Sequence, residues 1–463
     1  MIVSPGLLAP FHRPPGSGPL PGGTVGTVSV GGLGDPGTVL LSGPRRDGGR
    51  ETLAGHVGRW GTLPELDGGQ VLALLRSSGL DGRGGGGFPL ARKVATALAG
   101  GGRPVLVVNA SESEPASGKD RLLCARRPHL VLDGAALVAT ALGVSSVTVH
   151  LHRGADGPVE GVTRAVAERR SCRLDGVEWR VSRGPDRYVS GEASAVAGFL
   201  HDGDARPRFA VTPLALTGPS GRPTVVVNAE TVAHLAVVAR IGAGGWASLG
   251  PPSFPGSRLV THVGAVDHPG RVLEVVGAAT VGELLAPGGV TGPPAAVLVG
   301  GFAGTWLEGR DAWSTPFDRT ALVCLGASPG CGLLGVLPHG ACGLVEAARI
   351  VRYLAGESAG QCGTCVAGLP RLAAGLSALA QGTFRRRGLA RLAALGDELL
   401  GSGACGHPDG VVRLVRSTLE VFADDVVRHL AGAPCRGADH PAVLGVPDPY
   451  PTDGGPRSEE DFA

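Results

Sequence analysis

The chain has 463 residues, of which 43% are hydrophobic and 18% charged, with a formal net charge of +2. This length exceeds what one core supports and predicts about two to four domains. Near-neutral charge and an aromatic content of 4% argue against nucleic acid as a partner. No apolar run of about 18 residues is present, so no transmembrane segment is expected. Without a recognisable leader, we expect a cytoplasmic protein, with peripheral attachment at the inner face of a membrane as an option.

The cysteines and lysines are unevenly distributed. An odd number of cysteines, nine, without a secretion signal argues against a disulfide framework. Six of them lie between Cys324 and Cys405, which indicates one local site. Only two of the 42 basic residues are lysines, Lys93 and Lys119. Each lies beside an unusual loop.

Periodicity divides the first two thirds of the chain into an irregular segment and two mixed domains. Residues 1–55 are rich in glycine and proline and are expected to be irregular. Helices and strands then alternate, which predicts an α/β domain over 56–250. Short strands with one small helix predict a small α+β module over 251–320. The expected elements are helices over 64–79, 90–99, 129–142 and 281–285, and strands over 104–108, 146–151, 259–263 and 272–276.

From residue 343 onward only helical periodicity remains. Four apolar stripes with short connections predict an up-and-down four-helix bundle within a domain over 321–432. The stripes are Leu344, Ala348, Val351 and Leu354; Leu369, Leu372, Leu376 and Leu379; Leu389, Leu392, Leu395 and Leu399; and Val415, Leu419, Phe422 and Val426. The tail over 433–463 is rich in proline and aspartate and is expected to be disordered.

The glycine cluster over 82–88 is the first candidate site. Its spacing, Gly82-x-Gly84-x-x-Gly87, lets backbone N–H groups approach a phosphate, and the N-terminus of the following helix favours negative charge. In a glycine-rich chain the pattern is weak, since no clear strand runs into it, and a flexible linker is the alternative. Lys93 on the next helix favours anion binding.

Several further segments follow in a fixed order. They are SGLDGRGGGGFPLARK at 78–93, VLVVNASESEPASGKDR at 105–121, RRPHLVLDGAALVATALG at 126–143, YVSGEASAV at 188–196 and GRPTVVVNAETVA at 221–233. Together they resemble the NADH-binding flavoprotein subunit of respiratory complex I, the F subunit of the bacterial NADH–quinone oxidoreductase, which has relatives in soluble hydrogenases and formate dehydrogenases. The likeness continues through a β-grasp-like module of the SLBB type and a helical iron–sulfur domain, over residues 64–432.

The resemblance implies FMN bound in the α/β domain, with NADH stacked against it for hydride transfer. It places the cofactor phosphates at Gly82, Arg83, Gly84, Gly85 and Gly87, and the nicotinamide side at Phe88. The other positions that match flavin or nucleotide sites are Lys93, Asn109, Glu112, Glu114, Gly191, Glu192, Asn228 and Thr231. No residue is assigned a catalytic role, because the flavin carries the chemistry and the protein orients it.

The chain departs from the family pattern at several positions. Ser111, Ala193 and Val227 replace an Asp, a Glu and an Asn. Thr96 and Pro213 stand where the family has aromatic residues that help to hold the nucleotide. Losing those stacking faces weakens nucleotide affinity more than flavin affinity. We therefore expect any oxidation of NAD(H) to be weak.

The second candidate site is a group of cysteines. Cys362-x-x-Cys365 opens the second predicted bundle helix and Cys405 precedes the fourth, so the three thiols fall at the same end of the bundle. Soft thiolates suit an iron–sulfur cluster or zinc, and free buried cysteines are the alternative. Cys342 lies about 20 Å away along its helix, and Cys435 is interpreted as a packing residue.

The family motif E-S-C-G-x-C-x-x-C implies a [4Fe–4S] cluster at these cysteines, but its first ligand is Ala359 here. A non-cysteine fourth ligand, a [3Fe–4S] form and a lost cluster all stay open.

The sequence is thus interpreted as an NADH dehydrogenase-like electron-transfer flavoprotein. It would pass hydride from NADH to FMN, and single electrons on to an iron–sulfur cluster and a redox partner. That partner is a ferredoxin-like or thioredoxin-like iron–sulfur protein, in solution or within a membrane complex. One alternative is a divergent redox subunit that no longer oxidises NADH, and another is an assembly subunit that keeps only the fold.

Overall fold

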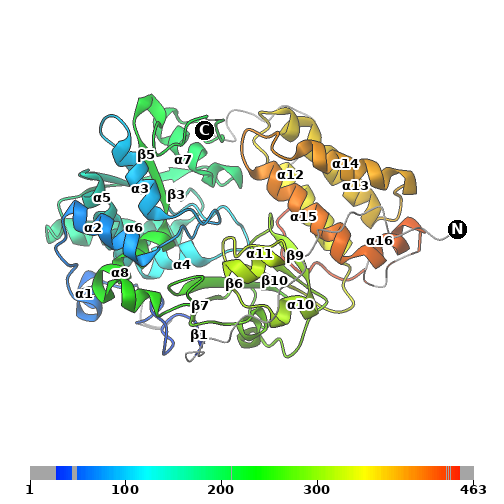
Figure 1. Cartoon of the computed structure of the whole chain (residues 1–463), viewed down its shortest axis with the longest axis horizontal. Coiled ribbons are helices and arrows are strands. Elements are labelled where there is room, and N and C mark those ends of the chain that lie inside the picture. Colours follow the sequence, from blue (N-terminus) through cyan, green and yellow to red (C-terminus); the bar gives the residue numbers. More distant parts are fainter. Residues whose placement is uncertain are drawn as a thin grey trace.

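The computed structural model describes residues 28–43, 50–209, 211–433, 435, 437 and 439–448. Three regions meet in the molecule: an α/β layer domain, a mixed β-sheet and a bundle of helices (Figure 1). Within the described ranges, no helix is both long and apolar enough to span a membrane.

The α/β domain is built on a four-stranded parallel sheet with the order β4-β3-β2-β5. Its strands are β2 (Val105–Asn109), β3 (Ser146–His152), β4 (Glu178–Gly184) and β5 (Thr224–Asn228). The predicted strands over 104–108 and 146–151 are confirmed to within a residue. β3 and β5 lie on opposite sides of β2, so the strand order reverses there. Such a reversal opens a crevice at the carboxyl ends of the strands.

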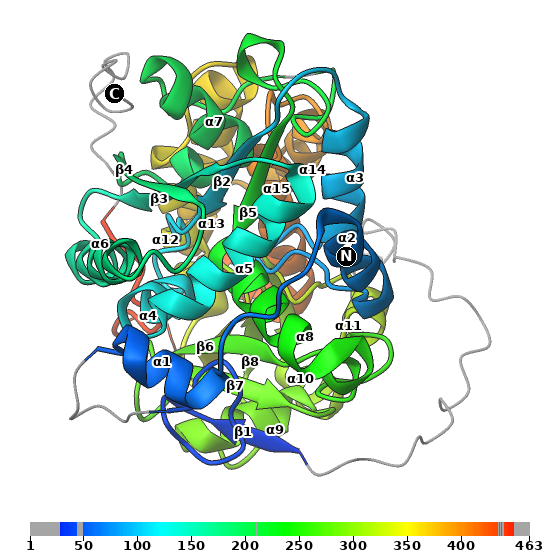
Figure 2. The same cartoon turned by 90° about the vertical axis from the view of Figure 1, so that its left-hand side faces the viewer.

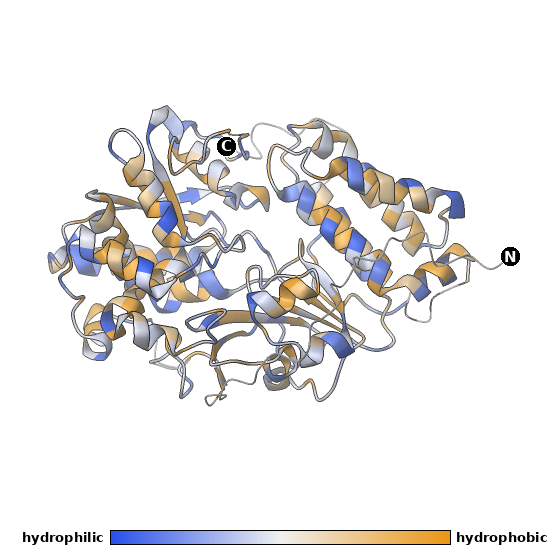
Figure 3. Cartoon of the chain, in the orientation of Figure 1, coloured by the Kyte–Doolittle hydropathy of each residue, from blue (hydrophilic) through white to orange (hydrophobic). Residues whose placement is uncertain are grey.

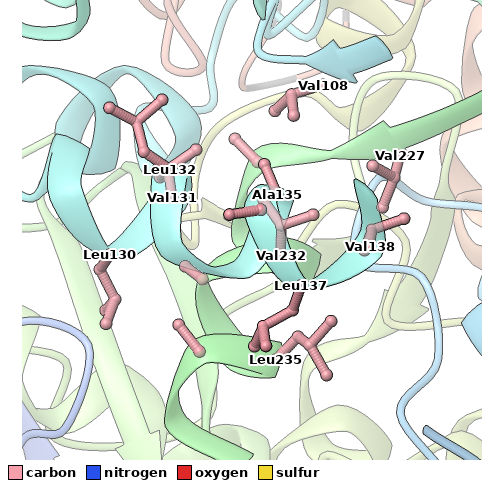
Figure 4. Close-up of a cluster of buried hydrophobic side chains, with 14 of the residues drawn as sticks. Val108, Leu130, Val131, Leu132, Ala135, Leu137, Val138, Val227, Val232 and Leu235 are labelled. Carbon is pink, nitrogen blue, oxygen red and sulfur yellow. The ribbon is translucent and has the colours of Figure 1, made fainter. Parts of the chain in front are cut away.

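Helices cover both faces of this sheet. They are α1 (Leu53–Trp60), α2 (Gly68–Ser78), α3 (Leu90–Ala99), α4 (Lys119–Arg126), α5 (Pro128–Leu142), α6 (Asp156–Ser171), α7 (Ala193–Asp202) and α8 (Ala229–Ala247). α5 crosses the sheet and packs on α8 through buried aliphatic side chains (Figures 2 and 4). The two helices approach so closely that a Cβ on Gly134 would lie 1.7 Å from the Val232 carbonyl oxygen. The predicted helices over 64–79, 90–99 and 129–142 are confirmed.

The second region is a six-stranded mixed sheet with the order β1-β7-β6-β10-β8-β9. Its strands are β1 (Ser29–Gly31), β6 (Arg258–Gly264), β7 (Val272–Val276), β8 (Ala296–Val299), β9 (Thr305–Glu308) and β10 (Leu333–Leu337), with α9 (Val281–Leu285), α10 (Gly309–Ser314) and α11 (Arg319–Cys324) beside them. The sheet extends beyond the predicted limits of 251–320, because β10 occupies an interior position between β6 and β8. The SLBB-type assignment of this module stays a prediction.

Part of the amino-terminal segment is ordered, contrary to expectation. β1 pairs with β7, and the buried carboxylate of Glu274 accepts hydrogen bonds from the N–H groups of Val39, Leu40 and Leu41 at 2.8, 3.0 and 3.0 Å. A buried carboxylate needs such donors, so it fixes this stretch of chain. The rest of the segment expected to be irregular, 1–27 and 44–49, lies outside the described residues.

The third region contains the predicted helices, with one difference. Its helices are α12 (Gly343–Gly356), α13 (Leu369–Ala380), α14 (Leu389–Leu399), α15 (His407–Val421) and α16 (Ala423–Leu430). Hydrophobic and hydrophilic bands alternate along them (Figure 3). The fourth predicted stripe spans two helices, because the backbone of Phe422 (φ −106°, ψ 33°) leaves the helical conformation between α15 and α16.

The tail is packed where it is described, and the expectation of disorder is wrong for that part. The buried carboxylate of Glu346 accepts hydrogen bonds from the N–H groups of Val443 (3.1 Å) and Leu444 (3.3 Å). The Leu444 side chain is 2% exposed and belongs to the core shared by the bundle and the mixed sheet. Residues 449–463 lie outside the described part of the tail.

Candidate functional site

The glycine loop is closed at its base and open at its tip. The Gly82 N–H donates to the Phe88 carbonyl at 2.9 Å, and the Arg83 N–H donates to Thr231 Oγ1 at 2.9 Å in the first turn of α8. A Cβ on Gly85 or Gly86 would meet no atom within 4 Å, and Gly85 has a φ of +105° that favours glycine. The loop therefore presents bare backbone to open space, as an anion cradle requires.

The loop faces the crevice at the reversal point of the parallel sheet. Asn109 and Asn228 end β2 and β5 as paired residues. Asn109 Nδ2 donates to the Gly191 carbonyl at 2.8 Å. A Cβ on Gly191 would lie 1.6 Å from Ser113 Oγ, so only glycine fits there. The Asn109 amide thus ties a strand end to one of the loops that surround the crevice.

A buried ion network supports the crevice from below. The Lys119 ammonium lies 2.9 Å from Asp120 Oδ2 and 3.1 Å from Glu230 Oε2. Burial lowers the pKa of Lys119, but these carboxylates together hold it above its usual value. The Glu112 carboxylate accepts hydrogen bonds from the N–H groups of Asp120 (3.1 Å) and Arg121 (2.8 Å). The network balances buried charge and fixes the start of α4 against α8.

Lys93 brings a second cation to the crevice. It projects from α3, and its Nζ donates to the Val226 carbonyl at 2.9 Å. Burial lowers its pKa, and the Glu192 carboxylate opposes this shift. An ammonium has three donors, so in the described part of the chain two of them remain for an acceptor in the crevice.

One cavity of about 630 Å³ joins these groups. Its lining includes every predicted cofactor residue except Arg83: Gly82, Gly84, Gly85, Gly87, Phe88, Lys93, Asn109, Glu112, Glu114, Gly191, Glu192, Asn228 and Thr231. The side chain of Arg83 points away, pairs with Asp81 at 2.6 Å and lies over the rings of Trp246 and Phe254. Arg83 therefore contributes its backbone rather than its charge.

Glu114 and Tyr188 occupy the wall between the three regions. Burial raises the pKa of Glu114 to about 7, although hydrogen bonds lower it. Its Oε2 accepts from the Phe302 N–H at 2.8 Å and lies 3.5 Å from the Tyr188 hydroxyl. The Tyr188 ring contacts the imidazole of His407, with ring centres 5.5 Å apart. Sequence reasoning did not select Tyr188 as a site residue, because nothing local in the sequence places it beside the bundle.

The three predicted cluster cysteines come together at one end of the bundle. Burial raises the pKa of the Cys362 thiol, but hydrogen bonds from Thr364 (2.7 Å), the Ala404 backbone and Cys365 lower it to about 7. Burial raises the pKa of Cys405, and the nearby charges of Glu192 and Cys362 add to this rise. Cys405 also lines the cavity that holds the glycine loop. The cysteine site and the crevice are therefore direct neighbours.

The spacing of these thiols favours a cluster over a single ion. Among the described residues, the one group of three donors within 4.8 Å of one another lies elsewhere in the bundle. Ala359, at the first-ligand position, is 6% exposed and packs in an apolar cluster with Val189 and Ala205. Position 359 thus offers no donor. The preceding Glu357 accepts from the Tyr188 N–H at 2.9 Å, which ties the cysteine loop to the α/β domain.

Comparisons with known proteins agree with this architecture. Residues 75–237 match the Nuo51 FMN-binding domain family, and residues 346–429 match the NADH-ubiquinone oxidoreductase-F iron-sulfur binding region. A second-copy F subunit of the NADH-quinone oxidoreductase of Rhizobium meliloti is 28% identical over 86% of this chain and 96% of its own length. The F subunit of Mycobacterium bovis is 29% identical over 81% of this chain and 87% of its own. The chain is a divergent member of this family of NADH-quinone oxidoreductase F subunits.

The fold has solved relatives outside complex I. A chain of the NAD⁺-reducing [NiFe]-hydrogenase in the H₂-reduced state superposes with a TM-score of 0.72 at 28% identity, over 79% of this chain. The air-oxidised form gives a TM-score of 0.71. The match spans 63% of the first hydrogenase chain, so further parts of that chain have no counterpart in it.

The departures from the family pattern have structural consequences. Ser111 donates from its hydroxyl to Asn109 Oδ1 at 2.8 Å, which is a hydrogen bond that an ionised aspartate could not donate. Thr96 Oγ1 donates to the Arg92 carbonyl of its own helix. Val227 is buried in the core. The replacements therefore leave the crevice intact and remove polar or aromatic groups around it.

Proposed function

We propose that this protein is an electron-transfer flavoprotein that accepts hydride from NADH on FMN and passes single electrons to an iron–sulfur cluster. One observation carries the proposal: a single cavity is lined by the glycine loop and Lys93 on one side and by Cys405 on the other. The names of the relatives, which are NADH-quinone oxidoreductase subunits and an NAD⁺-reducing hydrogenase, support the same reaction class.

The residues of the cavity fit FMN. The bare tip of the glycine loop, at Gly85 and Gly86, admits a phosphate because no side chain occupies that space. The free donors of Lys93 would stabilise negative charge on a bound ring system. FMN, when bound, supplies the conversion of two-electron hydride transfer into single-electron transfer. The protein contributes binding, orientation and charge.

Cys362, Cys365 and Cys405 would hold the iron–sulfur cluster, with Ala359 leaving one iron without a cysteine ligand. Thiolates are the usual protein ligands of such clusters. A protein redox partner would dock beside this end of the bundle, as expected of a homologue of proteins that belong to larger complexes. The partner's identity and any attachment to a membrane complex are part of this proposal.

Anaerobic purification followed by absorbance spectroscopy tests the proposal. We expect a flavin spectrum together with iron and labile sulfide, and bleaching of the flavin bands when NADH is added. Purified protein without flavin, after reconstitution with FMN, would contradict the assignment of the cavity.

A second candidate function is a redox subunit that no longer uses NADH. The loss of aromatic residues at Thr96 and Pro213 and of a carboxylate at Ala193 favours it. In that case the flavin and cluster are present, NADH leaves the spectrum unchanged, and a reduced ferredoxin-type protein bleaches the flavin. The same experiment therefore separates the two functions.

A further inference from the structure

A second group of soft donors lies in the bundle, apart from the three predicted cluster cysteines. Donor atoms of Cys342, His429 and Cys435 all lie within 4.8 Å of one another. Cys342 Sγ is 3.6 Å from His429 Nε2. The three residues are 1%, 2% and 7% exposed. Buried polar donors that converge in this way need a partner or a shared ligand.

The chain brings these residues together from three separate segments. Cys342 immediately precedes α12, His429 lies in the last turn of α16, and Cys435 follows α16 in the tail. The tail then folds back onto the start of α12, since a Cβ on Gly437 would lie 2.4 Å from the Gly340 carbonyl oxygen. The hydrogen bonds to Glu346 hold the following residues of the tail. The convergence is therefore fixed by contacts on both sides of Cys435.

We propose that Cys342, His429 and Cys435 form a structural zinc site. Two thiolates and one imidazole are the donor set that Zn²⁺ prefers, whereas Mg²⁺ and Ca²⁺ prefer oxygen ligands. Asp425 Oδ1 lies 3.6 Å from Cys435 Sγ and can complete a tetrahedral set directly or through a water molecule. Zinc binding would release the thiol protons, because the ion binds the deprotonated form.

An open cavity gives an ion access to this group. It has a volume of about 470 Å³, is bounded by α12, α13 and the segment after α16, and reaches His429. Such an entry path is part of what a metal site requires.

A disulfide between Cys342 and Cys435 is the competing use of these thiols. Both are free in the structure, and a disulfide would leave the imidazole of His429 beside them without a role. The close approach of His429 Nε2 to Cys342 favours metal binding.

The zinc site lies at the opposite end of α12 from the proposed cluster. α12 runs from Gly343 to Gly356, and the loop with Cys362 follows it, so a full helix length of about 20 Å separates Cys342 from that loop. Cys342 therefore cannot replace the missing fourth cluster ligand. The zinc would instead fasten α16 and the tail to the start of α12, whether or not the chain carries flavin.

Metal analysis of the full-length protein tests the site. After incubation with one equivalent of Zn²⁺ and desalting, we expect about one zinc per chain. Cys435→Ser should lower zinc affinity by at least about tenfold, since even groups that only support a metal ligand contribute about 10–100-fold. Cys324→Ser changes an exposed cysteine and serves as the matched control, with full zinc content expected.

Two further measurements keep the test decisive if a variant folds poorly. X-ray absorption at the zinc edge of the unmodified protein should show about two sulfur ligands at about 2.3 Å and nitrogen at about 2.0–2.1 Å. Cys362→Ser should keep its zinc, because Cys362 belongs to the proposed cluster. No bound zinc, zinc lost from Cys362→Ser but kept by Cys435→Ser, or a Cys342–Cys435 disulfide in freshly purified protein would each overturn the proposal.

Discussion

The crevice of the α/β domain and the cysteine end of the bundle are neighbours, but they are built in different ways. The crevice is shaped mainly by backbone: an open glycine loop, two paired strand ends and a glycine at 191 where no side chain fits. The cysteine end depends on three side chains that arrive from two loops, and a fourth is replaced by Ala359.

This difference explains which part of the family pattern tolerates divergence. Backbone geometry persists when surrounding side chains change, so substitutions such as Ser111 and Val227 leave the cavity open. A metal cluster depends on each ligand, so a single replacement at position 359 alters the chemistry directly. The comparison predicts that flavin binding is robust to side-chain change and that the cluster is fragile.

Filling the tip of the glycine loop should have the largest effect. Gly85→Val places a β-branched side chain at a φ of +105°, a conformation that costs about 1–3 kcal/mol and that the loop can escape only by rearranging. We expect flavin content to fall at least about tenfold, because the rearranged loop no longer presents its N–H groups to phosphate. Flavin released from the purified protein by denaturation is measured by fluorescence.

Gly102→Val is the matched control for this variant. Gly102 has a φ of +84° and open space around its Cβ position, but it lies on the turn between α3 and β2, away from the cavity. Both variants carry similar backbone strain, so equal flavin loss in the two would show that strain alone, and not the anion cradle, is responsible.

Removing a cysteine ligand should separate the two sites. In Cys405→Ala we expect iron to fall to background while FMN stays bound, because the glycine loop and Lys93 are untouched. Iron analysis and flavin fluorescence on the same sample measure both. Cys324→Ser, at an exposed position, should keep its iron. If Cys405→Ala loses flavin and iron together, the cavity and the cysteine end are one cooperative unit and the comparison fails.

Local patterns in the sequence were sufficient to predict most of the secondary structure and the crevice. Alternating apolar residues marked β2 and β3, and helical periodicity marked α5 and the bundle helices. Glycine spacing and the order of the motifs located the cavity, because its walls are short continuous segments. For Arg83 the motif gave the correct position but the wrong role, since its side chain turns toward Trp246.

Long-range contacts were beyond such patterns. Buried Glu274 and Glu346 hold the two terminal segments through backbone N–H groups more than 90 residues away, and no periodicity in those segments signals the attachment. β10 joins the mixed sheet only because β6 and β8 leave a place between them. Cys435 lies beside Cys342 for the same reason, and a packing role was all that its isolated position in the sequence indicated.

Restoring the family ligand should strengthen the cluster without altering the cavity. Ala359 lies in an apolar niche, where a cysteine adds little volume and its thiol is tolerated. We expect the unmodified protein to form a [3Fe–4S] species in air, because one iron lacks a cysteine ligand, and we expect Ala359→Cys to suppress it. Low-temperature EPR and iron analysis measure this difference. Iron in the variant alone would show that the natural site is vestigial, and iron in neither would remove the cluster from the proposed function.

The smallest effect concerns Glu114, which joins the crevice to the mixed sheet. Burial raises its pKa from 4.5 to about 7, so between these pH values the folded state binds more protons than the unfolded chain. The free energy of unfolding must then fall as pH rises through this range, by about 2–3 kcal/mol at most. Glu114→Gln removes this titration and should make the flavin-free protein less sensitive to pH, with a melting temperature that drops less between pH 5 and pH 8. Glu65→Gln, which removes a carboxylate from the loop before α2, should keep the steeper dependence of the unmodified protein. Equal slopes for all three proteins would show that Glu114 is ionised in the folded state throughout and that the hydrogen bonds from Phe302 and Tyr188 outweigh its burial.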